Sequence, residues 1–125
     1  MAKILIADDD YEIRELIIFS LRFAGHNVIG ASNGEETIER ARQARPDLIL
    51  LDVRMPKMNG YEVCKLLKGE KSTEAIPVIF LSVRGQENEV KAGFEVGADD
   101  YFLKPISPDK LIEKVNKALA RAGKS

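Results

Sequence analysis

The sequence predicts an α/β fold of the doubly wound kind, in which helices cover both faces of a parallel sheet. Short apolar runs of the length of buried strands recur at residues 3–7, 27–31, 48–51, 78–81 and 99–103. Segments with apolar residues at helical spacing separate these runs, and Gly, Pro or Asn stands at most of the joins. Five strands alternating with five helices through short loops specify such a sheet.

The first strand, KILIA, precedes a predicted helix over residues 11–24, with Asp10 as its N-cap and Gly25 as its C-terminal stop. The residues expected on its inward face are Ile13, Leu16, Ile17, Ser20, Leu21 and Ala24. Ile18, Phe19 and Phe23 add more apolar surface than one face needs. We interpret these three as wider contact with the core rather than as a surface for a partner.

The strand at 27–31 is weakened by Gly30, and the helix that follows begins with a capping box of Asn33 and Glu36 and ends near residue 44, before Pro46. The run at 48–51 is too short for a helix and too apolar for an exposed edge, so it predicts a central strand. A loop then leads to a helix over 61–68, which Gly69 stops.

Inward positions of the 61–68 helix are expected to be Val63, Leu66 and Leu67, with Cys64 as core filler. The helix predicted at 86–96 is the least apolar, with Val90, Gly93 and Phe94 on one face. The last helix has Ser107 as N-cap and Pro108 at its first position, and the tail is expected to fray from Ala120.

Length and composition limit the class of protein. A chain of 125 residues that is 45% apolar suits one domain over residues 1–125, and a net charge of −1 argues against direct binding to nucleic acid or to an anionic membrane. A single cysteine allows no internal disulfide and indicates a reducing compartment. The apolar runs are too short to cross a membrane, and a strand occupies the place of a signal peptide. We expect a cytoplasmic protein.

Right-handed crossovers and the strand order 2-1-3-4-5, the flavodoxin-like arrangement, place the first and third strands side by side where the chain reverses direction. Asp8 and Asp9 follow the first strand directly, and Asp52 follows the third. Ligands bind at the carboxyl ends of strands in such sheets. We therefore expect the three acids to meet at one edge, flanked by Ser82 and Lys104 after the fourth and fifth strands.

Three carboxylates in a partly dry site repel one another by roughly 4 kcal/mol per pair, at about 4 Å and an effective dielectric of about 20. An all-oxygen site of this kind favours a hard cation, Mg²⁺ or Mn²⁺. A divalent cation, the Lys104 ammonium and the Ser82 hydroxyl around one carboxylate would stabilise a phosphoryl group in transfer. Asp52 is then a candidate nucleophile that forms an acyl phosphate. The alternative is that Lys104 only pairs with the acids structurally.

The motifs together resemble the receiver domain of two-component response regulators, of the chemotaxis-regulator type, from residue 3 to about residue 119. The resemblance is carried by Asp8-Asp9, by Asp52 in LLDVRMPKMNG, by Ser82 and by Lys104-Pro105. It implies that Asp52 accepts a phosphoryl group from a phosphohistidine on a sensor histidine kinase or phosphotransfer protein. The domain would be a signalling switch with slow autodephosphorylation, not a conventional enzyme.

The same resemblance implies a role for each site residue. Asp9, Asp52 and the backbone carbonyl of Arg54 would ligate Mg²⁺, with Asp8 helping through water.

Ser82 and Lys104 would hold the phosphoryl oxygens. Ser82 and the aromatic Tyr101 would form the switch, which remodels the face of the fourth helix, fifth strand and fifth helix that contacts a downstream effector. The Lys104-Pro105 peptide would be cis.

Two residues depart from the commonest pattern of the family, and a third feature bears on whether the domain dimerises. Val83 stands where a small residue is usual beside the phosphorylation pocket, and Arg54 brings a cation to the pocket rim. The run Asp99-Asp100-Tyr101 resembles the subgroup that dimerises through the fourth and fifth helices.

Val90 occupies the position expected for a basic partner in such a dimer, while Lys114 remains available to Asp100. These residues therefore neither require nor exclude a phosphorylation-dependent homodimer.

Three other classes of protein share some of these features. A haloacid-dehalogenase-type phosphatase would use Asp8 and Asp10 as its Asp-x-Asp, but its acidic pair should follow a later strand, whereas Asp99-Asp100 precede the fifth. A flavodoxin-like cofactor binder should offer hydroxyls and amides after the first strand, where three acids would repel a phosphate. A receiver with idle chemistry would act as a constitutive adaptor.

Overall fold

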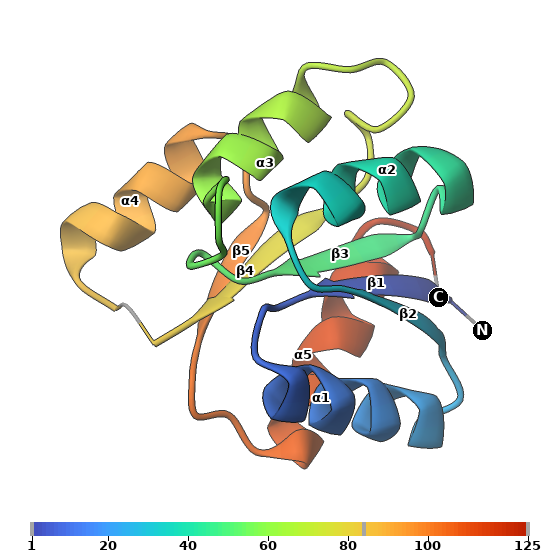
Figure 1. Ribbon diagram of the computed structural model, residues 1–125. Helices are drawn as coiled ribbons and strands as arrows, with labels where there is room; N and C mark the ends of the chain where they lie inside the picture. Colours follow the sequence, from blue (N-terminus) through green and yellow to red (C-terminus); the bar gives the residue numbers. More distant parts are fainter. Residues whose placement is uncertain (1, 84, 125) are drawn as a thin grey trace.

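A computed structural model of the protein describes residues 2–83 and 85–124. Five parallel strands form one sheet in the order β2-β1-β3-β4-β5, which confirms the predicted topology (Figure 1). The strands are β1 (Lys3–Ala7), β2 (Asn27–Ala31), β3 (Leu48–Leu51), β4 (Val78–Ser82) and β5 (Asp100–Leu103). The helices are α1 (Tyr11–Phe23), α2 (Gly34–Ala44), α3 (Gly60–Lys68), α4 (Glu87–Glu95) and α5 (Pro108–Arg121).

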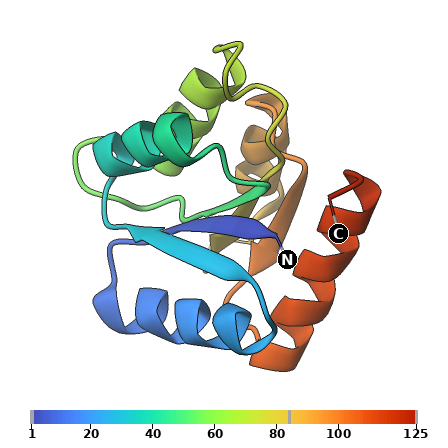
Figure 2. The same ribbon diagram turned by 90° about the vertical axis from the view of Figure 1, so that its right-hand side faces the viewer.

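The helices cover both faces of the sheet, and the core lies in two layers (Figures 1 and 2). α1 and α5 lie on one face, where Leu21 and Val115 belong to the same apolar cluster as Leu50 of β3. α2, α3 and α4 lie on the other face, where Val63 packs in a cluster with Leu51. With both faces covered, every residue of β3 is buried, as a central parallel strand requires.

Most predicted element boundaries agree with the structure to within one residue, but the C-terminal end differs. α5 continues to Arg121, so the predicted fraying from Ala120 is wrong. Gly123 has φ +73°, and this left-handed residue lets the Lys124 N–H donate to the Leu119 carbonyl at 2.8 Å. A C-terminal cap of this kind satisfies the last carbonyls of the helix and extends it.

The prediction that the additional apolar residues of α1 contact the core is wrong for its outer side. Ile17, Ile18 and Leu21 are buried as expected, but Leu16, Phe19 and Phe23 are 58%, 68% and 84% exposed. A surface helix meets the sheet on one side only, so apolar residues all around it cannot all reach the core.

Of two predictions for side chains of α3, one is wrong and one agrees with the structure. Leu66 of α3, expected inward, is 47% exposed. Cys64 is fully buried, and burial raises the pKa of its thiol to about 11, which agrees with its interpretation as core filler. Among the residues that the structure describes, no helix has both the length and the apolar character needed to span a bilayer.

Candidate functional site

The register of the sheet brings the predicted site residues to one edge. Ala7 of β1 is paired with Leu51 of β3, and the next residue of each strand is an acid. The Asp52 N–H donates to the Ala7 carbonyl at 2.9 Å, and the Asp8 N–H donates to the Ala31 carbonyl of β2 at 3.1 Å. These bonds continue the strand pairing by one residue, so they fix the backbone from which two of the carboxylates project.

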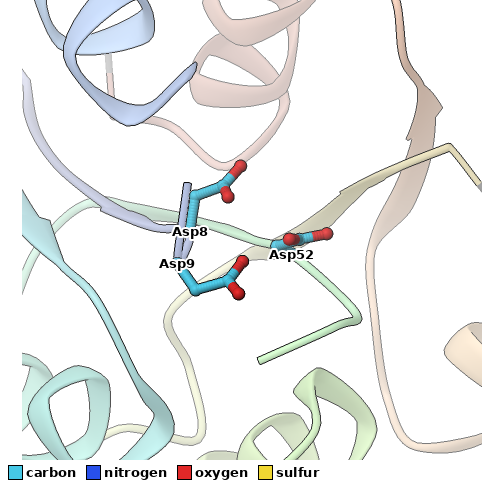
Figure 3. A group of neighbouring side chains, drawn as sticks. All are labelled: Asp8, Asp9 and Asp52. Atoms are coloured by element: carbon cyan, nitrogen blue, oxygen red, sulfur yellow. The ribbon is translucent and has the colours of Figure 1, made fainter. Parts of the chain in front are cut away.

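Three acids form the centre of the site (Figure 3). Asp8, Asp9 and Asp52 each have a carboxylate oxygen within 4.8 Å of the others. Asp8 and Asp52 are buried, whereas Asp9 is exposed. The structure thus brings together acids that lie more than forty positions apart in the chain.

Lys104 comes from the end of β5 and lies against these acids. The backbone N–H of Lys104 donates to the Ser82 carbonyl at 2.8 Å, and this bond extends the pairing of β4 with β5. Its Nζ lies 2.7 Å from Asp8 Oδ2 and 3.8 Å from Asp52 Oδ1. One ammonium therefore offsets part of the charge of two buried carboxylates. The Lys104–Pro105 peptide is cis, the isomer that the family resemblance implies.

The surroundings of Asp52 perturb the ionisation of its carboxyl. Burial is the largest cause and raises its pKa to about 7, the Lys104 ammonium opposes that rise, and the charges of Asp8 and Asp9 add to it. Burial thus favours the protonated acid. A divalent cation beside it would favour the carboxylate, which is the nucleophilic form.

The donor set fits a hard divalent cation. The converging groups are carboxylate oxygens, which Mg²⁺ and Mn²⁺ prefer, and they repel one another without a cation between them. Arg54, whose backbone carbonyl the resemblance adds to this set, is exposed and lies in the loop two residues after Asp52.

The loop from β3 to α3 packs against the backbone of Asp52 at Gly60. The sequence did not indicate this contact. The Gly60 N–H donates to the Val53 carbonyl at 2.7 Å, and a Cβ on Gly60 would lie 2.3 Å from the Asp52 carbonyl oxygen. Lys57 has φ +70° within a turn closed by the Met58 N–H on the Pro56 carbonyl at 2.8 Å. The loop can pass so close to Asp52 only because Gly60 has no side chain.

Ser82 ends β4 as predicted and is buried, at 1% exposure. The next residue, Val83, is 70% exposed. Its side chain also lines an apolar cavity of about 290 Å³ beside Lys104, between α1 and the start of α5. The remaining cavity walls come from Ile13, Leu16, Ile17, Ser20, Leu81, Pro105, Ile106, Pro108 and Leu111.

Asp10 does not join the acid cluster. Its side chain accepts a hydrogen bond from the Ile13 N–H at 3.1 Å and caps α1. A phosphatase that uses Asp8 and Asp10 together would need both carboxylates at the site, so the geometry does not support that alternative.

Tyr101, the predicted aromatic switch, is half-buried and belongs to a chain of three aromatic rings. Its ring centroid lies 5.8 Å from that of Phe80, which lies 5.2 Å from that of Tyr61 at the start of α3. The Tyr61 hydroxyl donates to the Glu89 carbonyl of α4 at 2.9 Å. Burial, followed by a hydrogen bond with Tyr101, raises the pKa of Tyr61. The structure therefore links Tyr101 to α4 through Tyr61, a residue that the sequence did not single out.

Asp100 and Lys114, which the sequence predicts as available to each other, each have another neighbour. Arg121 Nη2 lies 3.6 Å from Asp100 Oδ2, and Lys114 Nζ lies 5.0 Å from the ring centroid of Phe102. The α5 cations therefore pack along β5.

Comparisons with known proteins agree with this geometry. Residues 4–116 match the family model for the response regulator receiver domain. The chain is 42% identical over 120 residues to the alkaline phosphatase synthesis transcriptional regulatory protein PhoP of Bacillus subtilis, covering 96% of this chain and 49% of that protein. It is 41% identical over 120 residues to the phosphate regulon transcriptional regulatory protein PhoB of Pseudomonas aeruginosa, covering 96% and 52%. The chain thus spans about half the length of these relatives.

Solved structures give the same result. A putative response regulator from Chloroflexus aurantiacus superposes with a TM-score of 0.90 at 37% identity, covering 96% of this chain and 98% of that one. The chemotaxis protein CheY4 of Vibrio cholerae superposes with a TM-score of 0.90 at 32% identity, covering 94% and 98%. The fold, the converging acids and these matches lead to one conclusion: the chain belongs to the response regulator receiver domain family.

Proposed function

We propose that this chain is a phosphorylation-activated signalling switch in which Asp52 accepts a phosphoryl group from a phosphohistidine. The observation that carries the proposal is the convergence of Asp8, Asp9 and Asp52 with the Lys104 ammonium at one edge of the sheet. Asp52 is buried, and the bonds from its N–H to the Ala7 carbonyl and from the Gly60 N–H to the Val53 carbonyl hold the backbone at this point, as a positioned nucleophile requires.

In the proposed reaction an Asp52 carboxylate oxygen attacks the phosphorus of the donor phosphohistidine. The P–O bond of an acyl phosphate forms, the N–P bond breaks, and the imidazole nitrogen of the donor leaves with the electron pair and takes a proton. Asp8, Asp9, Asp52 and the Arg54 carbonyl would hold Mg²⁺, which supplies positive charge for the phosphoryl oxygens when bound. Lys104 and Ser82 would hold the remaining phosphoryl oxygens.

The partners follow from this chemistry. The donor would be a sensor histidine kinase or a phosphotransfer protein in the cytoplasm, and residues 1–125 would act as one receiver domain. The surface formed by α4, β5 and α5 would contact a downstream effector. Phe94 and Leu103 are 46% and 50% exposed on this surface, which gives such a partner apolar contacts.

A homodimer through the same surface is proposed as an alternative output. Acidic side chains stand in the first turn of α4, including Glu87 and Glu89, and basic side chains, including Lys117 and Arg121, stand on α5. Two copies related by a two-fold axis could pair these opposite charges.

The test of the proposed function is phosphoryl incorporation measured by intact mass. Protein incubated with a phosphorylated histidine kinase and Mg²⁺ is expected to gain the mass of one phosphoryl group, and the gain should disappear when EDTA replaces Mg²⁺. Lys104→Met, which keeps the length of the stem but removes the charge, should lower the rate of incorporation by about 10²-fold or more. Incorporation that is equally fast with EDTA would contradict the magnesium site.

The proposed switch gives a separate prediction for Tyr61→Phe. Loss of the hydroxyl removes the bond to the Glu89 carbonyl, so the variant should lose about 1 kcal/mol of stability and its α4 amides should exchange faster with solvent. Hydrogen exchange read by mass spectrometry measures this. Tyr11→Phe is the control, because the Tyr11 side chain is 66% exposed and far from α4 in the chain. Equal α4 exchange in the two variants would show that Tyr61 does not hold α4.

A further inference from the structure

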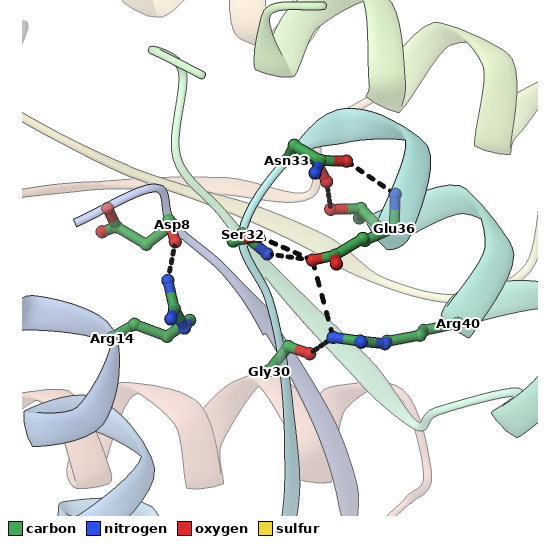
Figure 4. Close-up of polar contacts among 8 residues, drawn as sticks. Asp8, Arg14, Gly30, Ser32, Asn33, Glu36 and Arg40 are labelled. Carbon is green, nitrogen blue, oxygen red and sulfur yellow. Dashed lines mark hydrogen bonds and ion pairs between the residues drawn. The ribbon is translucent and has the colours of Figure 1, made fainter. Parts of the chain in front are cut away.

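Arg14 of α1 reaches back to the loop that carries the acids. Its Nη1 donates a hydrogen bond of 2.7 Å to the backbone carbonyl of Asp8, and Figure 4 shows the guanidinium directed at that oxygen. Nothing in the helical pattern of α1 pointed to this contact, which joins a side chain to a main-chain atom six residues earlier.

Two features hold the guanidinium in this position. Its Cζ lies 5.4 Å from the centroid of the Tyr11 ring, a distance at which a cation is attracted to an aromatic face. The stem of Arg14 passes over Gly30 of β2, where a Cβ would lie 3.3 Å from Arg14 Cδ and 3.0 Å from Ile18 Cδ1. Gly30 weakens β2 as a strand, but it leaves room for the side chain that reaches Asp8.

The Asp8 carbonyl belongs to the peptide group that joins Asp8 to Asp9. The side chain of Asp8 already has two partners, the Asp10 N–H at 3.0 Å and Lys104 Nζ at 2.7 Å. Asp9 differs, because its carboxylate is exposed and accepts no hydrogen bond from residues 2–83 or 85–124. Its direction therefore depends on the backbone from which it projects.

We propose that Arg14 is a positioning residue for the divalent-cation site, acting by fixing the Asp8–Asp9 peptide and hence the Asp9 carboxylate. This inference rests on the proposed function, since it concerns the same cation site. Arg14 would act through the Asp8 carbonyl, which its Nη1 contacts, and not as a ligand of the cation.

The charge of Arg14 and its hydrogen bond have opposite effects on cation binding. A guanidinium near three acids repels a divalent cation, so removal of the charge alone would tighten Mg²⁺ binding. Loss of the hydrogen bond would loosen Asp9 and weaken Mg²⁺ binding, because the carboxylate would have to be ordered on binding. The sign of the change therefore separates the two effects.

The contacts of two other arginines with β2, an outer strand of the sheet, supply a matched control. Arg22, also on α1, donates from Nη2 to the Val28 carbonyl at 2.9 Å, and Arg40 of α2 donates to the Gly30 carbonyl. Both arginines cap carbonyls of β2, but neither contacts the loop that carries the acids (Figure 4 shows Arg40). Arg22→Met removes a cation and a carbonyl cap without changing that loop.

The experiment is a Mg²⁺ titration of the ¹⁵N-labelled protein, followed by amide chemical shifts, which also report whether each variant is folded. Arg14→Met should bind Mg²⁺ about three- to tenfold more weakly than the unmodified protein. Arg14→Lys should bind more tightly than Arg14→Met, because its ammonium can still donate to the Asp8 carbonyl. Arg22→Met should bind with unchanged affinity.

Two results would overturn the inference. One is an Arg14→Met variant that binds Mg²⁺ as tightly as the unmodified protein or more tightly. The other is an Arg14→Lys variant that binds Mg²⁺ no better than Arg14→Met. The positive charge of lysine, without a positioning effect, would repel Mg²⁺ and give that result. If the unmodified protein bound no Mg²⁺ at all, the proposed function itself would fail, and that outcome is distinct from both.

Discussion

Asp52→Asn is expected to abolish phosphoryl incorporation and, at the same time, to make the metal-free protein more stable above pH 7. The amide cannot form an acyl phosphate, so the first effect is complete. The second effect follows from the pKa of Asp52, which burial raises from 3.8 to about 7. The folded protein therefore binds a proton more tightly at this position than the unfolded chain does.

The sign of the pH dependence follows from that shift. The protonated Asp52 carboxyl stabilises the folded protein. This stabilisation is fully present below the pKa of the unfolded chain, near pH 4, and is lost as the pH rises through the pKa of the folded protein, about 7. The loss amounts to about 2–4 kcal/mol for a shift of this size. Asp52→Asn should not show this part of the pH dependence, because its amide carries no charge at any pH.

Urea unfolding at pH 5 and pH 8, with EDTA present, measures the difference. Asp10→Asn is the control, since Asp10 is an exposed carboxyl and asparagine caps a helix as well as aspartate does. The account predicts a smaller loss of stability between the two pH values for Asp52→Asn than for Asp10→Asn. Parallel behaviour of the two variants would mean that Asp52 ionises as an ordinary surface carboxyl.

Gly60→Ala is expected to destabilise the protein strongly, although it adds only one methyl group. The added Cβ would lie 2.3 Å from the Asp52 carbonyl oxygen and 3.0 Å from Val53 Cα, and both neighbours are backbone atoms of the strand end. A clash with backbone cannot be relieved by turning a side chain, so the loop between β3 and α3 must move. We expect a cost of about 3 kcal/mol or more in the free energy of unfolding.

Gly69→Ala provides the comparison at the other end of α3. A Cβ there would lie 3.4 Å from the Lys65 carbonyl oxygen and 3.5 Å from that of Leu66, and the backbone at Gly69 has φ −87°. These are ordinary contacts at an ordinary φ, so the variant should be within about 1 kcal/mol of the parent protein. Urea midpoints followed by far-UV circular dichroism compare the two. Equal stability of the two alanine variants would show that the approach of Gly60 to Asp52 is not tight.

The strand ends could be predicted from sequence because a parallel sheet aligns them. Each apolar run is followed directly by its polar residue, so Asp8, Asp52 and Lys104 had to meet once the strand order was known. The order itself follows from right-handed crossovers between alternating strands and helices.

Other parts of the site depend on contacts that no local pattern contains. Arg14 and Tyr61 each donate a hydrogen bond to a backbone carbonyl outside their own helix, that of Asp8 and that of Glu89. Gly60 is visible in the sequence as a turn residue, but its approach to the Asp52 carbonyl exists only after the loop has folded back on β3. The exposure of Phe19 and Phe23 could not be predicted, because helical spacing shows that α1 is apolar but not how much of its surface the sheet covers.

The most direct measurement of the central claim is the location of the phosphoryl group. Protein phosphorylated by a histidine kinase in the presence of Mg²⁺ is reduced with borohydride, which converts an aspartyl phosphate to homoserine, and is then digested and sequenced by mass spectrometry. The account predicts homoserine at position 52 and an unchanged aspartate at positions 8 and 9. A reduced residue at position 8 or 9, or a stable phosphate on a hydroxyl side chain, would contradict it.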